Sequence, residues 1–340
     1  MRNRRRLAYI AAIDIVLAGL IIYLTFYSKH SWEGPEEKRI TIKQGETLSE
    51  IAADLNSNDI ISSRTLFKMV VRLLGQEGDI KANTYQFRSG LSNLDVLRII
   101  TGKEGFVLVR YTLPPGSTLR QAANIARKSL SLSPEKFLKE AENDSLLNVI
   151  GMKGKVKNLE GFLYPESYDV SPGISEKELV AVLFSEFQKK VYRNEEIMNE
   201  IRKQETDLLK VVTLASIVEA ETNVDEEKQT IAGVYLNRLK KGMKLEADPT
   251  VQYALPGGPK PRLLFEDLKI KSPYNTYLNQ GLPPGPINNP DVSCIRAALF
   301  PETHNYLFFV ATGNGGHNFS ETYQEHLDAI KEYKKNLRNK

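Results

Sequence analysis

The chain has 340 residues, of which 41% are hydrophobic and 26% charged, a composition typical of globular rather than disordered proteins. Its length is sufficient for two or three domains. The net charge of +4 comes from four arginines among the first six residues, because the rest of the chain holds 42 basic and 42 acidic residues. This neutral body argues against a nucleic-acid-binding protein. The single cysteine, Cys294, excludes an intrachain disulfide, and the four histidines lack the spacing of metal ligands, so no metal or other cofactor is expected.

An apolar segment follows the basic N-terminus. Residues 7–27 are long enough to cross a bilayer core of about 30 Å at roughly 1.5 Å per residue. Asp14 opposes insertion, but the apolar residues outweigh its cost of about 3 kcal/mol. A cleaved signal peptide is the alternative, although residues 26–30 form a poor cleavage site. The sequence predicts a cytoplasmic tail over residues 1–6, one transmembrane helix over 7–27, and an extracytoplasmic body at the bacterial cytoplasmic (inner) membrane.

A polar linker is predicted over residues 28–37, and a strand, a turn and a helix follow in residues 40–55. Gly45 marks the turn, and Thr47 is placed to cap the helix with Glu50 as its capping-box partner. This segment resembles the first half of a LysM module, a small fold that binds glycans containing N-acetylglucosamine. A generic strand–turn–helix unit is the alternative, and such a fold can also occur without sugar binding.

Strand–turn–helix units recur further along the chain. Similar patterns are found in residues 85–100 and 106–126. We therefore predict an α+β fold with a single N-terminal transmembrane helix, a small LysM-like α+β domain over residues 38–105, and a larger mixed α/β catalytic domain over residues 106–340.

The rest of the chain is predicted to be largely helical. A buried strand is expected at residues 306–310, and a glycine-rich turn at 312–320 lacks the Lys-Ser/Thr of a phosphate-binding loop. Helices are predicted over residues 133–150, 175–194, 195–207, 208–218, 224–241 and 290–300, and from 321 to the C-terminus. Residues 245–253 are predicted to form a loop that is followed by a short helix.

Two segments are too irregular for a helix or a strand. Residues 159–168 are rich in aromatic side chains, for which a place in the core is favoured over a place against sugar rings. Residues 272–287 contain four prolines, which remove backbone donors and fix φ. Long irregular stretches between packed elements are more often functional than not, and this one is dense in groups that bind sugars.

The predicted helix over residues 208–218 is apolar at spacings of three and four, and it ends in Glu219. Glutamate is rarely buried unless it is paired or functional. Apolar surroundings favour the neutral form of a carboxyl group, which suits a general acid. The structural alternative is an ion pair with Arg238 on the next predicted helix. Glu221 points to a different side of the helix, so the two glutamates do not by themselves make a two-carboxylate site.

Several ordered blocks cover most of the chain. They are ASIVEAET at 215–222, VYLNRL at 234–239, ADPTVQY at 247–253, YNTY at 274–277, GLPPGPI at 281–287 and GGHNF at 315–319, with a further block at 160–168. Together they closely resemble the MltG (YceG-like) family of membrane-anchored endolytic murein transglycosylases. The resemblance implies cleavage of the β-1,4 bond between N-acetylmuramic acid and N-acetylglucosamine without water, which leaves a 1,6-anhydromuramyl end and terminates glycan elongation.

The resemblance also implies roles for individual residues. The catalytic acid/base falls on Glu219, whereas Glu221, Arg238 and His317 are equally consistent with structural roles. The residues expected to bind substrate are Glu221, Asn237, Arg238, Asp248, Thr250, Gln252, Tyr274, Asn275, Thr276 and His317.

Two alternatives remain open at this stage. A muramidase would hydrolyse the same bond and would need a second carboxylate, which Glu221, Asp248 or Glu160 could supply. A non-catalytic glycan-binding scaffold is the other. The partners that the resemblance implies are peptidoglycan strands, penicillin-binding proteins of the elongation or division machinery, and the membrane, but no nucleic acid.

Overall fold

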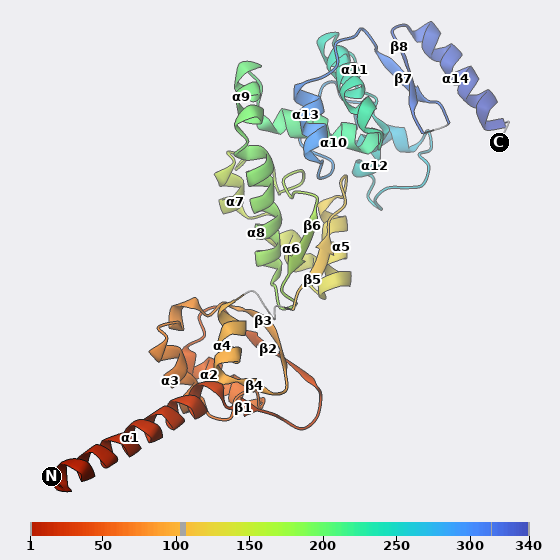
Figure 1. The fold of residues 1–340 in the computed structure, drawn as a ribbon. Helices are drawn as coiled ribbons and strands as arrows, with labels where there is room; N and C mark the ends of the chain where they lie inside the picture. Colours follow the sequence, from red (N-terminus) through yellow and green to blue (C-terminus); the bar gives the residue numbers. More distant parts are fainter. Residues whose placement is uncertain (1, 103–106, 314, 339–340) are drawn as a thin grey trace. The chain divides into compact units, whose positions relative to one another are not determined.

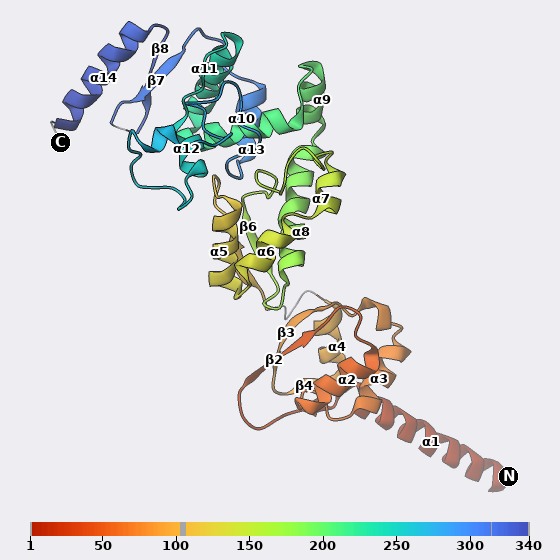
Figure 2. The ribbon, with the colours of Figure 1, turned by 180° about the vertical axis from the view of Figure 1, so that it is seen from behind.

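The computed structural model describes the backbone of residues 2–102, 107–313 and 315–338, and side chains from residue 13 to 336 outside the same gaps. The protein is a mostly helical α+β structure whose strands form small two-stranded sheets (Figures 1 and 2). Two compact units are present, Met1–Arg110 with Asp169–Ile174, and Tyr111–Tyr168 with Ser175–Lys340. The predicted domain boundary between residues 105 and 106 lies outside the described residues.

The first unit is built from short helices and two antiparallel strand pairs. Strand β1 pairs with β4, and β2 pairs with β3 over its whole length. The elements are α1 (Arg2–Tyr27), β1 (Lys29–His30), β2 (Glu37–Ile42), α2 (Leu48–Ser57), α3 (Arg64–Leu73), η1 (Glu77–Asp79), β3 (Asn83–Arg88), β4 (Leu91–Ser92) and α4 (Asn93–Thr101). The predicted strand–turn–helix units at 40–55 and 85–100 are confirmed, whereas α3 was not predicted.

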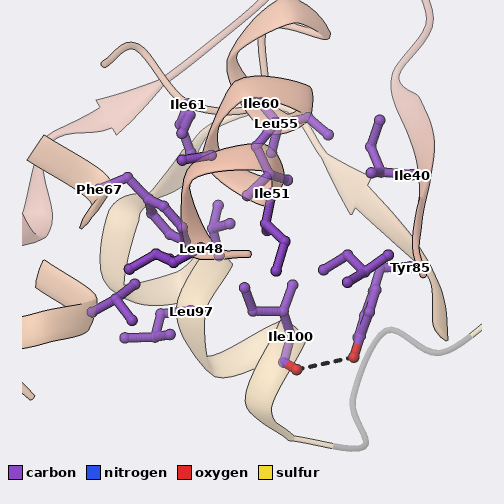
Figure 3. Close-up of a cluster of buried hydrophobic side chains, with 14 of the residues drawn as sticks. Ile40, Leu48, Ile51, Leu55, Ile60, Ile61, Phe67, Tyr85, Leu97 and Ile100 are labelled. Carbon is purple, nitrogen blue, oxygen red and sulfur yellow. Dashed lines mark hydrogen bonds between the residues drawn. The ribbon is translucent and has the colours of Figure 1, made fainter. Parts of the chain in front are cut away.

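Local signals explain where these helices begin. The predicted capping box at α2 is present, with the Thr47 hydroxyl accepting from the Glu50 backbone and the Glu50 carboxylate accepting from the Thr47 N–H at 2.7 Å. The helices enclose an apolar core (Figure 3), in which the buried Tyr85 donates its hydroxyl hydrogen bond to the carbonyl oxygen of Ile100 at 2.9 Å. The phenol is therefore satisfied where water is absent.

Helix α1 covers the predicted transmembrane segment. Apolar side chains from Ile13 to Leu24 are exposed, with Ile15 at 72%. Among the described residues, no helix combines the length and the apolar character needed to cross a membrane, so the predicted span is not supported. The side chains of residues 7–12, which belong to that predicted segment, are outside the described set.

Helices dominate the second unit, and the predicted mixed α/β character is reduced in the described residues to the strand pair β7–β8 and the part of β5–β6 that belongs to this unit, Tyr111–Thr112 and Ser167–Tyr168. The elements are β5 (Val109–Thr112), α5 (Leu119–Leu130), α6 (Pro134–Glu140), α7 (Asp144–Val149), β6 (Ser167–Val170), α8 (Glu176–Phe187), η2 (Gln188–Tyr192), α9 (Glu195–Lys203), α10 (Leu208–Glu221), η3 (Asp225–Glu227), α11 (Lys228–Lys240), α12 (Asp248–Ala254), η4 (Asp267–Lys269), α13 (Val292–Leu299), β7 (Phe308–Ala311), β8 (His317–Ser320) and α14 (Tyr323–Arg338).

The C-terminal part differs from the prediction in two respects. The strand expected to be buried at 306–310 is β7, and its side chains are only half-buried. Residues 317–320, expected to belong to a glycine-rich turn, form strand β8, which pairs antiparallel with β7. The turn is therefore shorter than predicted, and it connects a hairpin.

Helix α10 is the centre of the second unit. All its residues from Val211 to Val218 are buried, which is the pattern of a helix enclosed by protein on every side. It packs against α13 and α11 (Figure 1). Asp207 caps its N-terminus by accepting from the Lys210 N–H at 2.9 Å.

The side chain of Asn289 connects three segments that are distant in sequence. Its Oδ1 accepts from the backbone N–H groups of Gly161 and Leu163, both at 3.0 Å, and its Nδ2 donates to the carbonyl oxygen of Ser117 at 2.8 Å. The backbone N–H of Asn289 donates to the carbonyl oxygen of Ser117, and the N–H of Gly116 donates to that of Asn289, both at 2.9 Å. The irregular segments around residues 117, 161 and 289 are thereby held together next to the C-terminal end of α10.

Replacement of Gly161 by alanine should destabilise the protein. Gly161 has φ +87°, and a Cβ atom there would overlap Pro286 and approach Val212 to 3.0 Å. Left-handed strain and overpacking together predict a loss of about 3 kcal/mol in the free energy of unfolding, measurable by urea denaturation. Gly154→Ala is the matched control, because Gly154 has φ +78° but nothing within 4 Å, and it should lose only about 1 kcal/mol. Equal losses would contradict the packing argument.

Candidate active site

Glu219 lies in the last turn of α10 and is partly exposed. Its Oε2 accepts a hydrogen bond from the backbone N–H of Asp291 at 2.9 Å, immediately before α13. The thiol of Cys294 also hydrogen-bonds Glu219, and burial followed by the charge of Glu219 raises the pKa of that thiol. The apolar neighbours Ile217 and Val218 are fully buried. The carboxylate itself therefore meets hydrogen-bond donors rather than apolar walls.

The buried ammonium group of Lys228 lies near Glu219. Lys228 donates to Ser293 at 2.8 Å and forms an ion pair with Asp225 at 2.5 Å. Burial lowers the pKa of Lys228, but the hydrogen bond to Asp225 and the nearby negative charges, among them Glu219, outweigh burial and raise it. The surroundings of Glu219 thus include a buried positive charge.

The structural alternative of a Glu219–Arg238 ion pair is not what the structure contains. Arg238 donates from Nε to the carbonyl oxygen of Leu307 at 2.6 Å and from Nη1 to that of Leu245 at 2.7 Å. Its ion-pair partner is Glu246, at 3.6 Å. Arg238 therefore ties the loop after α11 to the segment before β7.

A pocket of about 390 Å³ opens beside the end of α10. Glu219 adjoins this pocket, because a Cβ atom on the lining residue Gly116 would lie 3.6 Å from the Cγ atom of Glu219. The polar lining residues include Glu221, Asp248, Gln252 and Asn288. A second pocket of about 600 Å³ shares residues with the first, and the shared residues are Thr118, Gln121, Gln252, Tyr253 and Pro259. The two pockets therefore form one extended cleft.

Glu160 lines the second pocket and is 93% buried, since only 7% of its surface is exposed. Its Oε1 accepts from the backbone N–H of Leu119 at 2.9 Å and from Asn289 at 3.4 Å, and its Oε2 accepts from the Tyr253 hydroxyl at 3.4 Å. Burial raises the pKa of Glu160 to about 8, although these donors and the charge of Arg120 oppose that shift. The group is therefore largely neutral at pH 7.

Glu221 and Asp248 face the first pocket from α10 and α12. The Tyr235 hydroxyl donates to Glu221 at 2.6 Å, and the Tyr277 hydroxyl donates to Asp248 at 2.7 Å. Burial raises the pKa of Glu221 to about 7; the Tyr235 hydrogen bond opposes this shift, and the charge of Asp248 adds to it. Burial thus raises the pKa of two carboxyl groups of the cleft, Glu160 and Glu221.

The predicted substrate-binding residues fall into two groups. Glu221, Asp248 and Gln252 line the first pocket, and the ring of Tyr274 packs against that of Tyr253 with centroids 4.9 Å apart. The other six hold the chain around them through their side chains. Asn237 donates to the carbonyl oxygens of His304 and Tyr306, and Arg238 holds the carbonyl oxygens described above. Thr250 and Thr276 hydrogen-bond each other and the backbone of Ala247. Asn275 donates to the carbonyl oxygens of Leu268 and Ile270, and His317 is hydrogen-bonded to Glu227. Substrate contact by these residues stays a prediction.

Sequence reasoning missed the segment that follows the proline-rich run. Asn288 lines the first pocket, the Asn289 side chain accepts from the Gly161 N–H, and the Asp291 N–H donates to Glu219. The Ser216 hydroxyl on α10 accepts from the backbone N–H of Ile287 at 3.0 Å. Two consecutive asparagines between GLPPGPI and a helix were the available signal. Among the residues that the structure describes, no cluster of three or more His, Cys, Asp or Glu side chains could hold a metal ion.

An extended cleft with carboxyl groups, amides and a pair of tilted tyrosine rings is consistent with a protein that binds and processes carbohydrate. The family model for the YceG-like family matches residues 40–332, and the chain belongs to this family. A Bacillus subtilis protein named endolytic murein transglycosylase is 35% identical over 309 residues, which cover 86% of this chain and 84% of the relative.

More distant relatives agree with this membership. A Streptococcus pneumoniae protein of the same name is 27% identical over 85% of this chain, which spans 57% of that relative. The crystal structure of a yceG-like protein from Listeria monocytogenes aligns with a TM-score of 0.59 at 30% identity, over 86% of this chain and 98% of that one.

The raised pKa of Glu160 predicts a dependence of stability on pH. Between its ordinary value of 4.5 and about 8, the folded protein binds this proton more tightly than the unfolded chain does. The stabilising contribution is therefore complete below pH 4.5 and is lost as the pH rises toward 8. Glu160→Gln cannot ionise, so the fall in unfolding free energy between pH 5.5 and 8 should shrink by on the order of 2 kcal/mol.

Urea denaturation at a series of pH values measures this slope. Glu142→Gln is the matched control, because Glu142 lines the same pocket but is exposed. An unchanged slope in Glu160→Gln, or the same change in both variants, would contradict the assignment.

Proposed function

We propose that this protein is an endolytic murein transglycosylase, which cleaves the β-1,4 bond between N-acetylmuramic acid and N-acetylglucosamine in peptidoglycan strands. Membership of the YceG-like family and the names of the relatives support this proposal. The observation that carries it for this chain is a partly exposed carboxylate, Glu219, beside an extended cleft and hydrogen-bonded to the Asp291 N–H. An extended cleft suits a long strand that is cut within its length.

In the proposed reaction one carboxyl group acts first as the general acid and then as the general base. Protonated Glu219 gives its proton to the glycosidic oxygen as the bond from the muramyl anomeric carbon breaks. The resulting carboxylate accepts the proton of the muramyl 6-hydroxyl, and that oxygen bonds to the anomeric carbon. The product is a 1,6-anhydromuramyl end, no water is consumed, and Glu219 regains its proton. The Asp291 N–H holds the Glu219 carboxyl in place through Oε2.

The other carboxyl groups of the cleft suit different roles. The oxygens of Glu160 accept from protein donors, and Glu221 accepts from Tyr235. Because protein donors occupy the oxygens of Glu160 and Glu221, these two groups suit substrate binding rather than proton transfer. In a hydrolase, Glu221, Asp248 or Glu160 would serve as the second carboxylate. The products distinguish these reactions, because hydrolysis adds one water.

The location and the partners implied by the resemblance are also proposals. We place the protein at the bacterial cytoplasmic membrane, where it would act on nascent strands beside penicillin-binding synthases and terminate their elongation. The exposed apolar side chains of α1 between Ile13 and Leu24 support attachment to lipid. Glycan binding by the LysM-like first unit likewise remains a proposal.

The test uses the full chain in detergent with uncrosslinked peptidoglycan strands and mass spectrometry of the products. Fragments one water lighter than hydrolysis products are expected from the wild type. Glu219→Gln should lose at least about a hundredfold in rate, the usual contribution of a general acid–base group. Glu226→Gln, an exposed carboxylate in η3 just beyond α10, is the matched control and should keep its rate. Products that carry the added water would reject the transglycosylase in favour of a muramidase. Absence of fragments from the wild type would favour the scaffold.

A further inference from the structure

Helix α3 of the first unit carries apolar side chains on its exposed side. Leu66, Met69 and Leu73 follow one another at spacings of three and four residues, so they form one stripe along the helix. They are 36%, 39% and 67% exposed, whereas the core residues of α3 are fully buried. A contiguous apolar patch on the surface of a protein typically marks a place where something binds.

Basic side chains border this apolar stripe. Lys68 and Arg72 have the same helical spacing one position earlier, and α3 contains no acidic residue. The Nζ atom of Lys68 donates to the neutral hydroxyl of Ser49 at 3.4 Å, and that bond leaves its charge uncompensated. Both stripes line one surface hollow of about 410 Å³, and its lining residues are Thr65, Lys68, Met69, Arg72 and Leu73. The hollow therefore suits a partner that presents apolar groups next to negative charge.

Helix α3 lies beside the end of α1 that enters the first unit (Figures 1 and 2). This end of α1 is fixed, because Asn93 donates to the carbonyl oxygen of Thr25 at 2.8 Å and Phe26 packs against the core of the unit. The exposed rings of Tyr23 and Tyr27 stack there with centroids 5.9 Å apart. Tyrosine is enriched at the level where a bilayer meets water. Attachment of α1 to lipid, as proposed above, would therefore bring α3 to the level of the lipid headgroups.

We infer that the exposed face of α3 docks on the surface of an anionic bilayer. The apolar stripe would enter the upper acyl region, and Lys68 and Arg72 would reach the phosphate groups, which is the arrangement of an interfacial amphipathic helix. The inference rests on the proposed attachment of α1 and goes beyond it, because a second contact gives the first unit one orientation toward the lipid. An acidic protein partner is the competing occupant, and the neighbouring apolar surface of α1 favours lipid.

The test uses the full chain in nanodiscs whose lipids carry bromine on the upper acyl carbons, where it quenches nearby fluorophores. A bimane label on Thr65→Cys reports on α3, since Thr65 is exposed and lines the hollow but belongs to neither the apolar stripe nor the basic pair. A label on Val16→Cys reports on α1, where Val16 is 68% exposed. The unsubstituted protein, treated in the same way, measures any label on the buried Cys294.

Both labels should be quenched in nanodiscs of phosphatidylcholine and phosphatidylglycerol, and fluorescence lifetimes give the ratio of quenched to unquenched label. Adding Lys68→Gln and Arg72→Gln should lower this ratio at Thr65 about thirtyfold, roughly fivefold for each charge lost near an anionic surface, and should leave it unchanged at Val16. Arg39→Gln with Lys43→Gln is the matched control, because it removes the same charge from exposed positions on and just after β2. This control should keep the ratio at Thr65.

The apolar stripe is tested independently of the charges. Leu73→Ser changes an exposed residue and leaves the core intact, so the protein should fold. It should lower the ratio at Thr65 about tenfold, the value of burying one leucine side chain. An unchanged ratio would overturn the inference, because the stripe would then not enter lipid.

Quenching at Val16 but not at Thr65 would overturn the inference while the attachment of α1 stands, and it would favour a protein partner for α3. Absence of quenching at both positions would reject the attachment and the inference together. An equal fall with both pairs of charge substitutions would also overturn the inference, since net charge rather than the α3 face would then draw the first unit to lipid. None of these results depends on cleavage of murein, so this inference and the proposed reaction can fail independently.

Discussion

The buried side chain of Asn289 is the interaction on which the cleft depends. It is completely inaccessible to solvent, and its amide bonds to Gly161, Leu163 and Ser117. Each hydrogen bond contributes only about 1 kcal/mol net, but removing the amide would leave several backbone groups buried and unpaired, at a larger cost for each. Three segments without regular structure can be held this way because one planar group presents a donor and an acceptor in fixed directions. Gly161 has no Cβ, and only for this reason can the proline-rich run approach so closely.

Burial and hydrogen bonding place the carboxyl groups of the cleft in different environments. Glu160 is buried and Glu221 is partly buried in the pocket wall, and burial raises their pKa values to about 8 and about 7. Glu219 is partly exposed and is held by a backbone N–H, a thiol and the field of Lys228. Glu160 and Glu221 are thus held by protein donors, whereas the partly exposed Glu219 adjoins the cleft. The proposed one-carboxylate reaction needs a catalytic group that the strand can reach, because that group must exchange its proton with the substrate.

Helices and caps could be predicted because their signals are local. The capping box at Thr47 and the apolar helix that ends at Glu219 needed only a few neighbouring residues. Helix α3 was missed although its signals are present, because Ser63 caps it and its buried residues Phe67, Val70 and Val71 follow the helical period. Strand β8 was missed because three glycines precede it, and because nothing in the sequence indicates that residues 317–320 pair with β7.

The site was harder to predict than the fold, since it is assembled from distant contacts. No periodicity shows that Asp291 donates to Glu219, or that Arg238 turns toward Leu245 and Leu307. Residues chosen for their sugar-binding chemistry, such as Asn275, instead hold the backbone of an irregular loop that has too few internal hydrogen bonds of its own. A polar side chain in a long loop is therefore ambiguous until its partners are known.

Asn288 and Asn289 show how the partners resolve that ambiguity. They are adjacent and both are buried, so sequence and exposure do not separate them. The amide of Asn289 bonds to Gly161, Leu163 and Ser117, whereas that of Asn288 donates to the carbonyl oxygen of Ser216 on α10 and leaves its own buried oxygen without a protein donor. The two amides therefore contribute unequally to the fold. Loss of the Asn289 side chain would unpair backbone groups in several segments, whereas loss of the Asn288 side chain would remove one contact to α10.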